Sequence, residues 1–236
     1  MDIQTFITNY QEAFGEKATL PILFYYSDAP IAKTEKINGC FFKGIASVRE
    51  GNSISLNADV IGCGGGKLYT GYAPMNDYIP SFVSQKEKYN HTPQQVIDYV
   101  ASLELQSLTG TWLNFVRIDQ AKSFEGMEGL LFLATPDMLS GLTTWAYFDN
   151  DREDAVCAIF GSGCSAVVSQ AVRENRTGGH RTFLGLFDPS VRPYVGAYEL
   201  SFVIPANRFT SMMKTMRECC LFGTHAWNKV RARINE

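Results

Sequence analysis

Several features that would indicate particular functions are scarce or missing from this chain. Charged residues make up 19% of its 236 residues, below the usual quarter, and the formal net charge is −3. Because there is no basic excess, we expect neither a nucleic-acid partner nor an anionic membrane partner. No apolar run approaches the ~20 residues that a membrane-spanning helix needs. The composition therefore argues against nucleic-acid-binding and membrane-spanning proteins.

The usual marks of a secreted protein are also missing. Residues 1–7 show no basic segment followed by an apolar one, so we expect no signal peptide. The six cysteines lie at irregular spacings that do not resemble a disulfide framework. We therefore expect a cytoplasmic location, with thiols that are free or engaged by a ligand.

Familiar catalytic and nucleotide-binding motifs are not found. Lys67 follows a glycine run, but the next residue is Leu68, and the spacing G-x-x-x-x-G-K-[ST] is not met. Neither glycine-rich turn fits G-x-G-x-x-G, and no G-x-S-x-G elbow occurs. No cysteines are paired as C-x-x-C, and the three histidines show no metal-ligand spacing. The sequence thus identifies neither a reaction nor a cofactor.

What is present predicts one sizeable core. Hydrophobic residues make up 45% of the chain and aromatic residues 13%, and no composition shift marks a linker, so we expect a single domain over residues 1–236. Apolar runs of strand length alternate with helical periodicity, which predicts an α/β or α+β fold with a mixed sheet flanked by helices. The predicted helices cover residues 2–14, 82–90, 93–103, 138–147 and 209–220, and the predicted strands 21–26, 31–35, 54–58, 112–118, 129–134, 155–160, 182–186 and 198–204.

Two stretches repeat one plan of strand, glycine turn with cysteine, and helix. Residues 155–172 run from a short apolar segment through Phe160-Gly161-Ser162-Gly163 into a segment of helical spacing that begins at Cys164-Ser165. Residues 58–69 do the same through Cys63-Gly64-Gly65-Gly66. The repetition predicts a functional site built from both turns.

Cys164 is the first candidate for chemistry. A thiol at a helix N-terminus meets the positive end of the helix dipole and free amides, and both favour the thiolate. The amides of Gly161, Ser162 and Gly163, with Ser165 beside them, suit a phosphate or carboxylate. The alternative is a tight turn whose small residues only let the helix pack on its strand.

Cys63 is the matching candidate in the first turn. Lys67, one turn further on, is placed to steady a thiolate or an anion. Cys40 follows Asn38-Gly39 and is able to meet the other two thiols in space, so a metal ion or iron–sulfur cluster held by Cys40, Cys63 and Cys164 is a second interpretation. The remaining cysteines, Cys157, Cys219 and Cys220, are expected to be buried apolar residues.

A basic, glycine-bearing loop lies further along the chain. His180 has the chemistry of an acid or base, although a histidine in a surface loop more often has no such role. Arg173, Arg176 and Arg181 have the chemistry to clamp an acidic ligand, or equally to solvate a helix end.

The order of these features resembles a known family, the prokaryotic domain of unknown function 169, from about residue 21 to residue 216. The residues that carry the resemblance are Ala29-Pro30-Ile31-Ala32, Cys40 before Ala46 and Gly51, Cys63-Gly64-Gly65 with Gly71, the segment 129–136, Cys164, and the segment 198–205. The resemblance implies cysteines at the positions of Cys40, Cys63 and Cys164, and it brings no established activity.

This chain departs from the family pattern at one point. The family often has Gly-Cys-x-Gly-Ser-Arg before the last strand, whereas residues 186–192 read Leu-Phe-Asp-Pro-Ser-Val-Arg. Ser190 and Arg192 match the end of that element, but its cysteine is missing. A four-cysteine cluster would therefore lack one ligand here, which weakens the metal interpretation.

Three hypotheses follow. The first is a pocket between the two turns that binds a small molecule, with Cys63 and Cys164 facing it and Lys67 or Arg192 pairing an anionic group; both an enzyme and a binding protein are compatible with it. The second is the metal or iron–sulfur protein. The third is a non-catalytic structural or interaction protein with inert cysteines. The aromatic and methionine content is compatible with a homo-oligomer.

Overall fold

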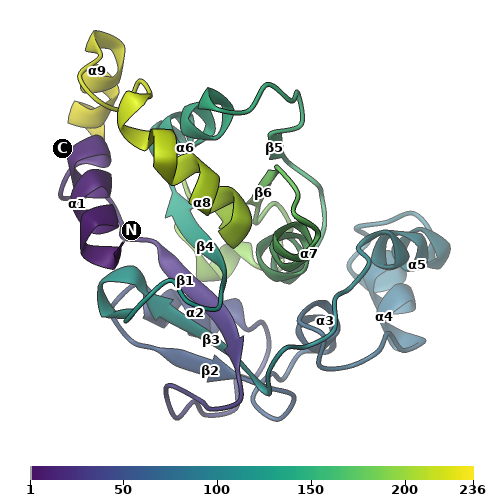
Figure 1. Cartoon of the computed structure of the whole chain (residues 1–236). Helices are drawn as coiled ribbons and strands as arrows, with labels where there is room; N and C mark the ends of the chain where they lie inside the picture. The colour runs from purple at the N-terminus through teal and green to yellow at the C-terminus, as the bar shows by residue number, and fades with distance from the viewer. Residues whose placement is uncertain (1) are drawn as a thin grey trace.

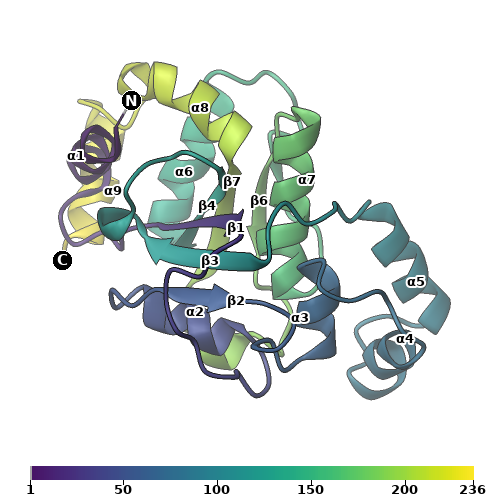
Figure 2. The ribbon, with the colours of Figure 1, turned by 60° about the horizontal axis from the view of Figure 1, so that its bottom comes forward.

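Seven strands of this chain form one mixed sheet with helices on both of its faces, as seen in the computed structural model, which describes residues 2–236 (Figures 1 and 2). The strand order is β2-β3-β1-β4-β7-β6-β5. Among the strands of residues 2–236, β5 and β6 pair in parallel, and the other neighbours are antiparallel. The predicted class, a mixed sheet flanked by helices, is confirmed. The strands are β1(Ile22–Ser27), β2(Ile54–Leu56), β3(Trp112–Arg117), β4(Met127–Ala134), β5(Val156–Cys157), β6(Thr182–Gly185) and β7(Leu200–Pro205).

Each face of the sheet covers its own hydrophobic core because side chains alternate along a strand. In β4, Leu131 and Leu133 belong to one core, whereas Leu130 and Phe132 belong to the other. All residues of β4 are buried, as expected for a central strand covered on both faces. One core is covered by α1(Ile3–Phe14), α6(Pro136–Phe148), α8(Ala206–Thr215) and α9(His225–Ile234), and the other by α2(Phe42–Val48), α3(Gly64–Tyr69) and α7(Gln170–Thr177).

A small helical lobe stands beside the sheet, at the right of Figures 1 and 2. It contains α4(Tyr78–Ser81), the π-helix η1(Phe82–Lys86) and α5(Pro93–Ser102). A capping box stands at the start of α5: the Gln95 amide donates to Thr92 Oγ1 at 3.3 Å, and the Thr92 amide donates to Gln95 Oε1 at 3.1 Å. This local signal fixes where the lobe's main helix begins.

Several predicted elements differ from those found. The strand predicted over 54–58 ends at Leu56, and the helix predicted over 82–90 is the π-helix η1, which ends at Lys86. Residues 31–35 form no strand, because the amides of Ile31 and Ala32 bond to the Ser55 hydroxyl instead of a neighbouring strand. The strand predicted over 155–160 shrinks to two residues, β5, since it pairs with β6 alone at the edge of the sheet. The helix predicted over 209–220 is α8, followed by the short 3-10 helix η5(Met216–Glu218). The other 3-10 helices are η2(Ile118–Gln120) and η4(Arg192–Tyr194).

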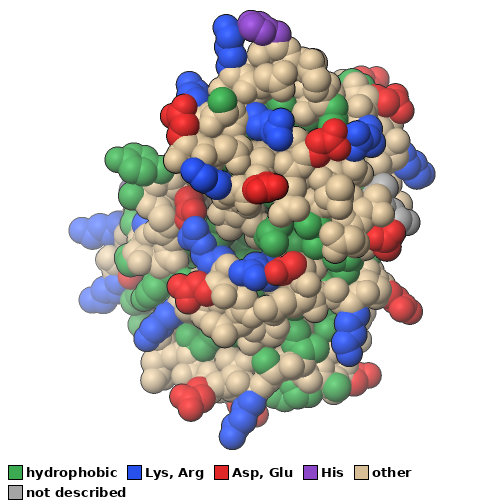
Figure 3. Space-filling model, turned by 90° about the vertical axis from the view of Figure 1, so that its left-hand side faces the viewer, with side chains coloured by type: hydrophobic (Ala, Val, Ile, Leu, Met, Phe, Trp, Pro, Cys, Tyr) green, Lys and Arg blue, Asp and Glu red, His purple; other side chains and the backbone are tan. Residues whose placement is uncertain are grey.

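On the side of the molecule that includes α1 and α9, charged side chains of the two signs are mixed (Figure 3). Figure 3 shows positive and negative side chains interspersed there, with hydrophobic side chains between them. Among residues 2–236, no helix combines the length and apolar character needed to cross a bilayer.

Candidate functional site

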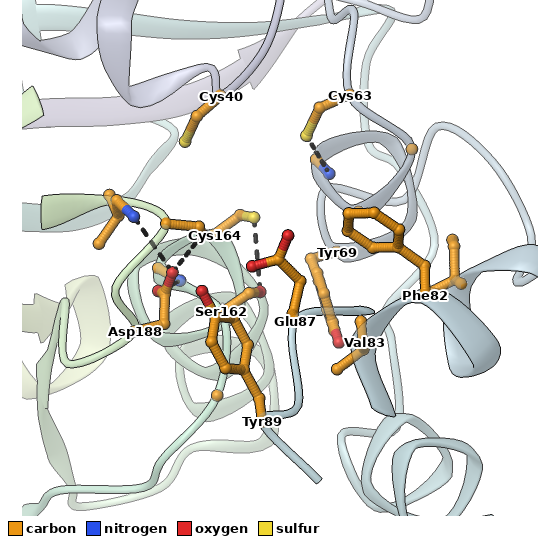
Figure 4. A pocket seen from close by; sticks show the side chains of 18 of the residues that line it. Cys40, Cys63, Tyr69, Phe82, Val83, Glu87, Tyr89, Ser162, Cys164 and Asp188 are labelled. Atoms are coloured by element: carbon orange, nitrogen blue, oxygen red, sulfur yellow. Dashed lines mark hydrogen bonds between the residues drawn. The ribbon is translucent and has the colours of Figure 1, made fainter. Parts of the chain in front are cut away.

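The two glycine turns border one cavity of about 620 Å³ between the sheet domain and the helical lobe. Figure 4 shows three thiols, those of Cys40, Cys63 and Cys164, around this space. The predicted juxtaposition of these cysteines is therefore found. Lobe residues Phe82, Val83, Glu87, Tyr89, Val96 and Tyr99 form the opposite wall, and further lining residues are Gly39, Gly64, Gly65, Gly66, Tyr69, Asn76, Tyr78, Ile79, Asn90, Phe160, Gly161, Ser162, Gly163, Asp188, Ser190, Val191 and Tyr194.

The first turn contributes a short helix whose opening residues have no side chains. Cys63 is the N-cap of α3, and its Sγ accepts the Gly66 amide at 3.0 Å. A Cβ at Gly66 would lie 2.9 Å from Ile61 Cγ2, so close packing requires glycine there. A Cβ at Gly64 or Gly65 would meet nothing closer than 3.9 Å. Those two glycines are therefore not required by packing, and they leave the cavity open.

The second turn is held by Ser162 and by contact with the lobe. The helical backbone starts at Gly163, and the Ser162 carbonyl and hydroxyl oxygens accept the Ser165 amide at 3.0 and 3.3 Å. Serine is a preferred capping residue for this reason. A Cβ at Gly161 would lie 2.0 Å from the Tyr99 hydroxyl, so glycine permits the close approach of α5. The turn and the lobe are thus fitted to each other.

The anion expected at this helix N-terminus is supplied by the protein itself. Asp188 is 1% exposed, and its carboxylate accepts the Gly163 amide at 2.6 Å and the Val191 amide at 3.2 Å (Figure 4). The Ser190 hydroxyl donates to the same carboxylate. Gly163 therefore has no free amide for a phosphate or a ligand carboxylate, and in this respect the prediction is corrected.

The three thiols are protonated rather than activated. Cys164 is only 6% exposed, and burial raises its pKa well above the ordinary value, with the neighbouring Cys63 adding to the rise. Burial likewise raises the pKa of Cys63, against the opposing amides of Gly66 and Gly65 and the charge of Lys67. The pKa of Cys40 rises to about 11, chiefly through burial. The expected dipole effect on Cys164 is thus outweighed by desolvation, and the thiolate interpretation is corrected.

This pattern predicts slow alkylation near neutral pH. In the native protein, the rate at which iodoacetamide modifies Cys40 should increase about tenfold per pH unit up to about pH 11, because only the thiolate reacts. The unfolded chain releases the proton first, near pH 9, so the contribution of Cys40 to stability should be lost as the pH rises from about 9 through about 11. Site-resolved mass spectrometry against pH measures the rates, with urea-unfolded protein as the control. Rapid native modification below pH 7 would contradict this prediction.

The metal interpretation gains no geometric support. Across residues 2–236, no group of three or more histidine, cysteine, aspartate or glutamate side chains is arranged so that it could hold a metal ion. The three thiols border the same cavity without converging on one point in this structure.

The basic residues assigned to a ligand lie elsewhere. Arg192 donates to backbone carbonyls, among them Gly196 at 3.0 Å and Ala197 at 2.9 Å, so it ties its own loop together. Lys67 acts on Cys63 through its charge but does not line the cavity. Ser165 is fully buried, and its hydroxyl lies 2.9 Å from that of Tyr99. Arg192 and Lys67 therefore do not pair with a ligand charge inside this cavity, which corrects that part of the prediction.

The basic loop is likewise occupied by the protein's own acids. Arg176 pairs with the buried Glu128, and Arg181 pairs with Asp154 at 2.8 Å. Asp154 also lies 2.8 Å from His180 Nε2. Together with Arg173, which donates to the Ser102 carbonyl, these residues lie outside the cavity lining.

Sequence reasoning missed the acidic and aromatic wall of the lobe. Glu87 and Tyr89 lie just after the π-helix η1, in a segment that reads only as a short, charged helix. Asp188 reads only as a turn residue before Pro189. The spacing of Tyr69, Tyr72 and Tyr78 suggests either an aromatic lid or core packing, and both occur: Tyr69 and Tyr78 line the cavity, whereas Tyr72 packs on the core and donates to the Leu56 carbonyl.

The fold is that of a mixed α/β protein with a thiol-lined cavity beside its sheet. The family described as domain of unknown function 169, uncharacterised ArCR, matches residues 17–215, so the chain belongs to that family. Neither the curated proteins nor the solved structures include a match to this chain.

Proposed function

We propose that this protein binds a small organic molecule in the cavity between its two glycine–cysteine turns. The observation that carries the proposal is that segments distant in sequence, residues 39–40, 63–66, 161–164 and 188–191, converge with the lobe on one cavity. Its volume of about 620 Å³ lies within the range of ~300–1,000 Å³ typical of small-molecule sites.

The chemistry of the lining supports the same proposal. Aromatic rings, neutral thiols and glycine backbone make up most of the wall, and a few polar groups such as Ser162 and Glu87 interrupt it. Such a mainly apolar wall with few oriented polar groups is typical of ligand sites. Two of the helical segments beside the cavity contain a π-helical turn, at η1 and at η3(Ser165–Ser169), and such turns occur frequently at functional sites.

Gly64 offers a direct test, because it lines the cavity and a Cβ there would meet no neighbour closer than 3.9 Å. We expect the neutral dye N-phenyl-1-naphthylamine to bind the unmodified protein with a rise in fluorescence. Gly64→Leu should weaken that binding at least tenfold, equivalent to ~1.4 kcal/mol. It should not lower the melting temperature, since glycine is the poorer helix former by about 1 kcal/mol. Fluorescence titration and thermal unfolding measure the two effects.

Ala101→Leu is the matched control. Ala101 is exposed on α5 of the same lobe and does not line the cavity, so dye binding should be unchanged. If the dye does not bind, or if both variants weaken it equally, the proposal is wrong and an inert structural protein is favoured. Stoichiometric metal in the purified protein would instead favour the metal interpretation with Cys40, Cys63 and Cys164.

A further inference from the structure

The charge of the cavity wall points to the class of ligand, an inference that rests on the proposed function. No lysine, arginine or histidine of the described chain lines the cavity, and its ionisable side chains besides tyrosines and thiols are Glu87 and Asp188. Asp188 already accepts hydrogen bonds from Gly163, Ser190 and Val191. Glu87 is therefore the remaining carboxylate that can serve a ligand.

Glu87 has no cationic partner of its own. Within residues 2–236 it forms no ion pair, although Lys86 and Lys88 flank it in sequence. Both lysines are exposed and do not line the cavity, whereas Glu87 and Tyr89 are partly buried and do. Lys88 has a positive φ of 57°, a conformation uncommon for a residue with a side chain. Such backbone strain clusters at ligand-binding sites.

Aromatic rings surround the carboxylate. Figure 4 shows Glu87 pointing into the space bordered by Tyr69, Phe82 and Tyr89. Burial raises the pKa of Tyr89, and the adjacent Glu87 carboxylate adds to that rise. The negative faces of aromatic rings attract organic cations, and a carboxylate beside them supplies the counter-charge. An anionic ligand would meet like charge here.

We propose that the ligand of this cavity is a small organic cation, an amine whose ammonium group pairs with Glu87 while its apolar part lies against the aromatic and thiol wall. This replaces the anionic ligand that the glycine turns alone suggested. Glu87 is one carboxylate of the cavity wall, so its effect on ligand charge can be measured separately from the binding of a neutral ligand.

Displacement of N-phenyl-1-naphthylamine by three indoles of similar size tests the inference at pH 7. Tryptamine is a cation, indole-3-propionamide is neutral and indole-3-propionate is an anion. We expect tryptamine to displace the dye at a concentration about tenfold lower than the amide, and the anion to be the weakest, as a charge-assisted hydrogen bond implies. Glu87→Gln should weaken tryptamine about tenfold and leave the amide unchanged.

Glu104→Gln is the matched control, because Glu104 is an exposed carboxylate just past α5 that does not line the cavity. It should leave all three midpoints unchanged. Equal displacement by tryptamine and the amide, or an equal loss for all three in Glu87→Gln, would overturn the cation inference while dye binding kept the proposed function intact. Failure of the dye itself to bind would overturn the proposed function instead.

Discussion

Replacing Asp149 by alanine is expected to lower the free energy of unfolding by about 3–5 kcal/mol, because it leaves a buried guanidinium without its partner. Arg208 in α8 is 5% exposed, and its two terminal nitrogens bond to the Asp149 carboxylate at the end of α6, one of them at 3.1 Å. It also donates to the Ala146 carbonyl at 2.9 Å. This contact joins two helices that cover the same face of the sheet.

Two further variants make the result specific. Asp137→Ala removes an ion pair with Arg233, whose side chain is 61% exposed, and should cost less than about 1 kcal/mol. Asp149→Ala combined with Arg208→Met should recover most of the loss, since no charge is then left buried. Urea unfolding measures all three. Equal losses in Asp149→Ala and Asp137→Ala would contradict the role assigned to Arg208.

Asp188→Ala is the second large effect, and it links stability to the site. The buried amides of Gly163 and Val191 would lose their acceptor, which should destabilise the protein by about 2–4 kcal/mol. Removal of the carboxylate should also lower the pKa of Cys164, because the Asp188 charge contributes to its rise. We therefore expect faster alkylation of Cys164 at pH 8 and weaker binding of N-phenyl-1-naphthylamine.

Hydrogen exchange shows which amides lose protection when Asp188 is replaced. In the absence of denaturant, the Gly163 and Val191 amides should exchange faster in Asp188→Ala than in the unmodified protein. Asp188→Asn should have an intermediate stability, since one acceptor oxygen remains. If both amides stay protected in Asp188→Ala, Asp188 does not anchor the second turn.

Local features were predictable because their causes lie within a few residues. The helix at the start of the chain follows from Ile3, Phe6, Ile7 and Tyr10 at helical spacing, and it is found as α1 ending before Gly15. The capping box at Thr92 needs only Gln95 three residues later. The two glycine–cysteine turns are likewise local patterns, whereas the position of Cys40, Cys63 and Cys164 at one cavity results from tertiary packing.

The charge of the site could not be predicted in this way. Lys67 and Arg192 were predicted to pair with an anionic ligand, but the sequence does not show that Arg192 donates to backbone carbonyls of its own loop. Likewise, Glu87 lies 77 residues before Cys164 in sequence, and only the packing of the lobe on the sheet domain brings the two to one cavity.

The sequence by itself determined the class of fold, the start of its best-capped helices and the cysteine–glycine turns, because periodicity, capping and turn chemistry act over short distances. Only the tertiary structure decided that Asp188 occupies the helix N-terminus at Gly163, that burial keeps the thiols protonated, and that the cavity wall is acidic and aromatic. Desolvation and electrostatics depend on every group packed around a site, and those groups come from segments far apart in the chain.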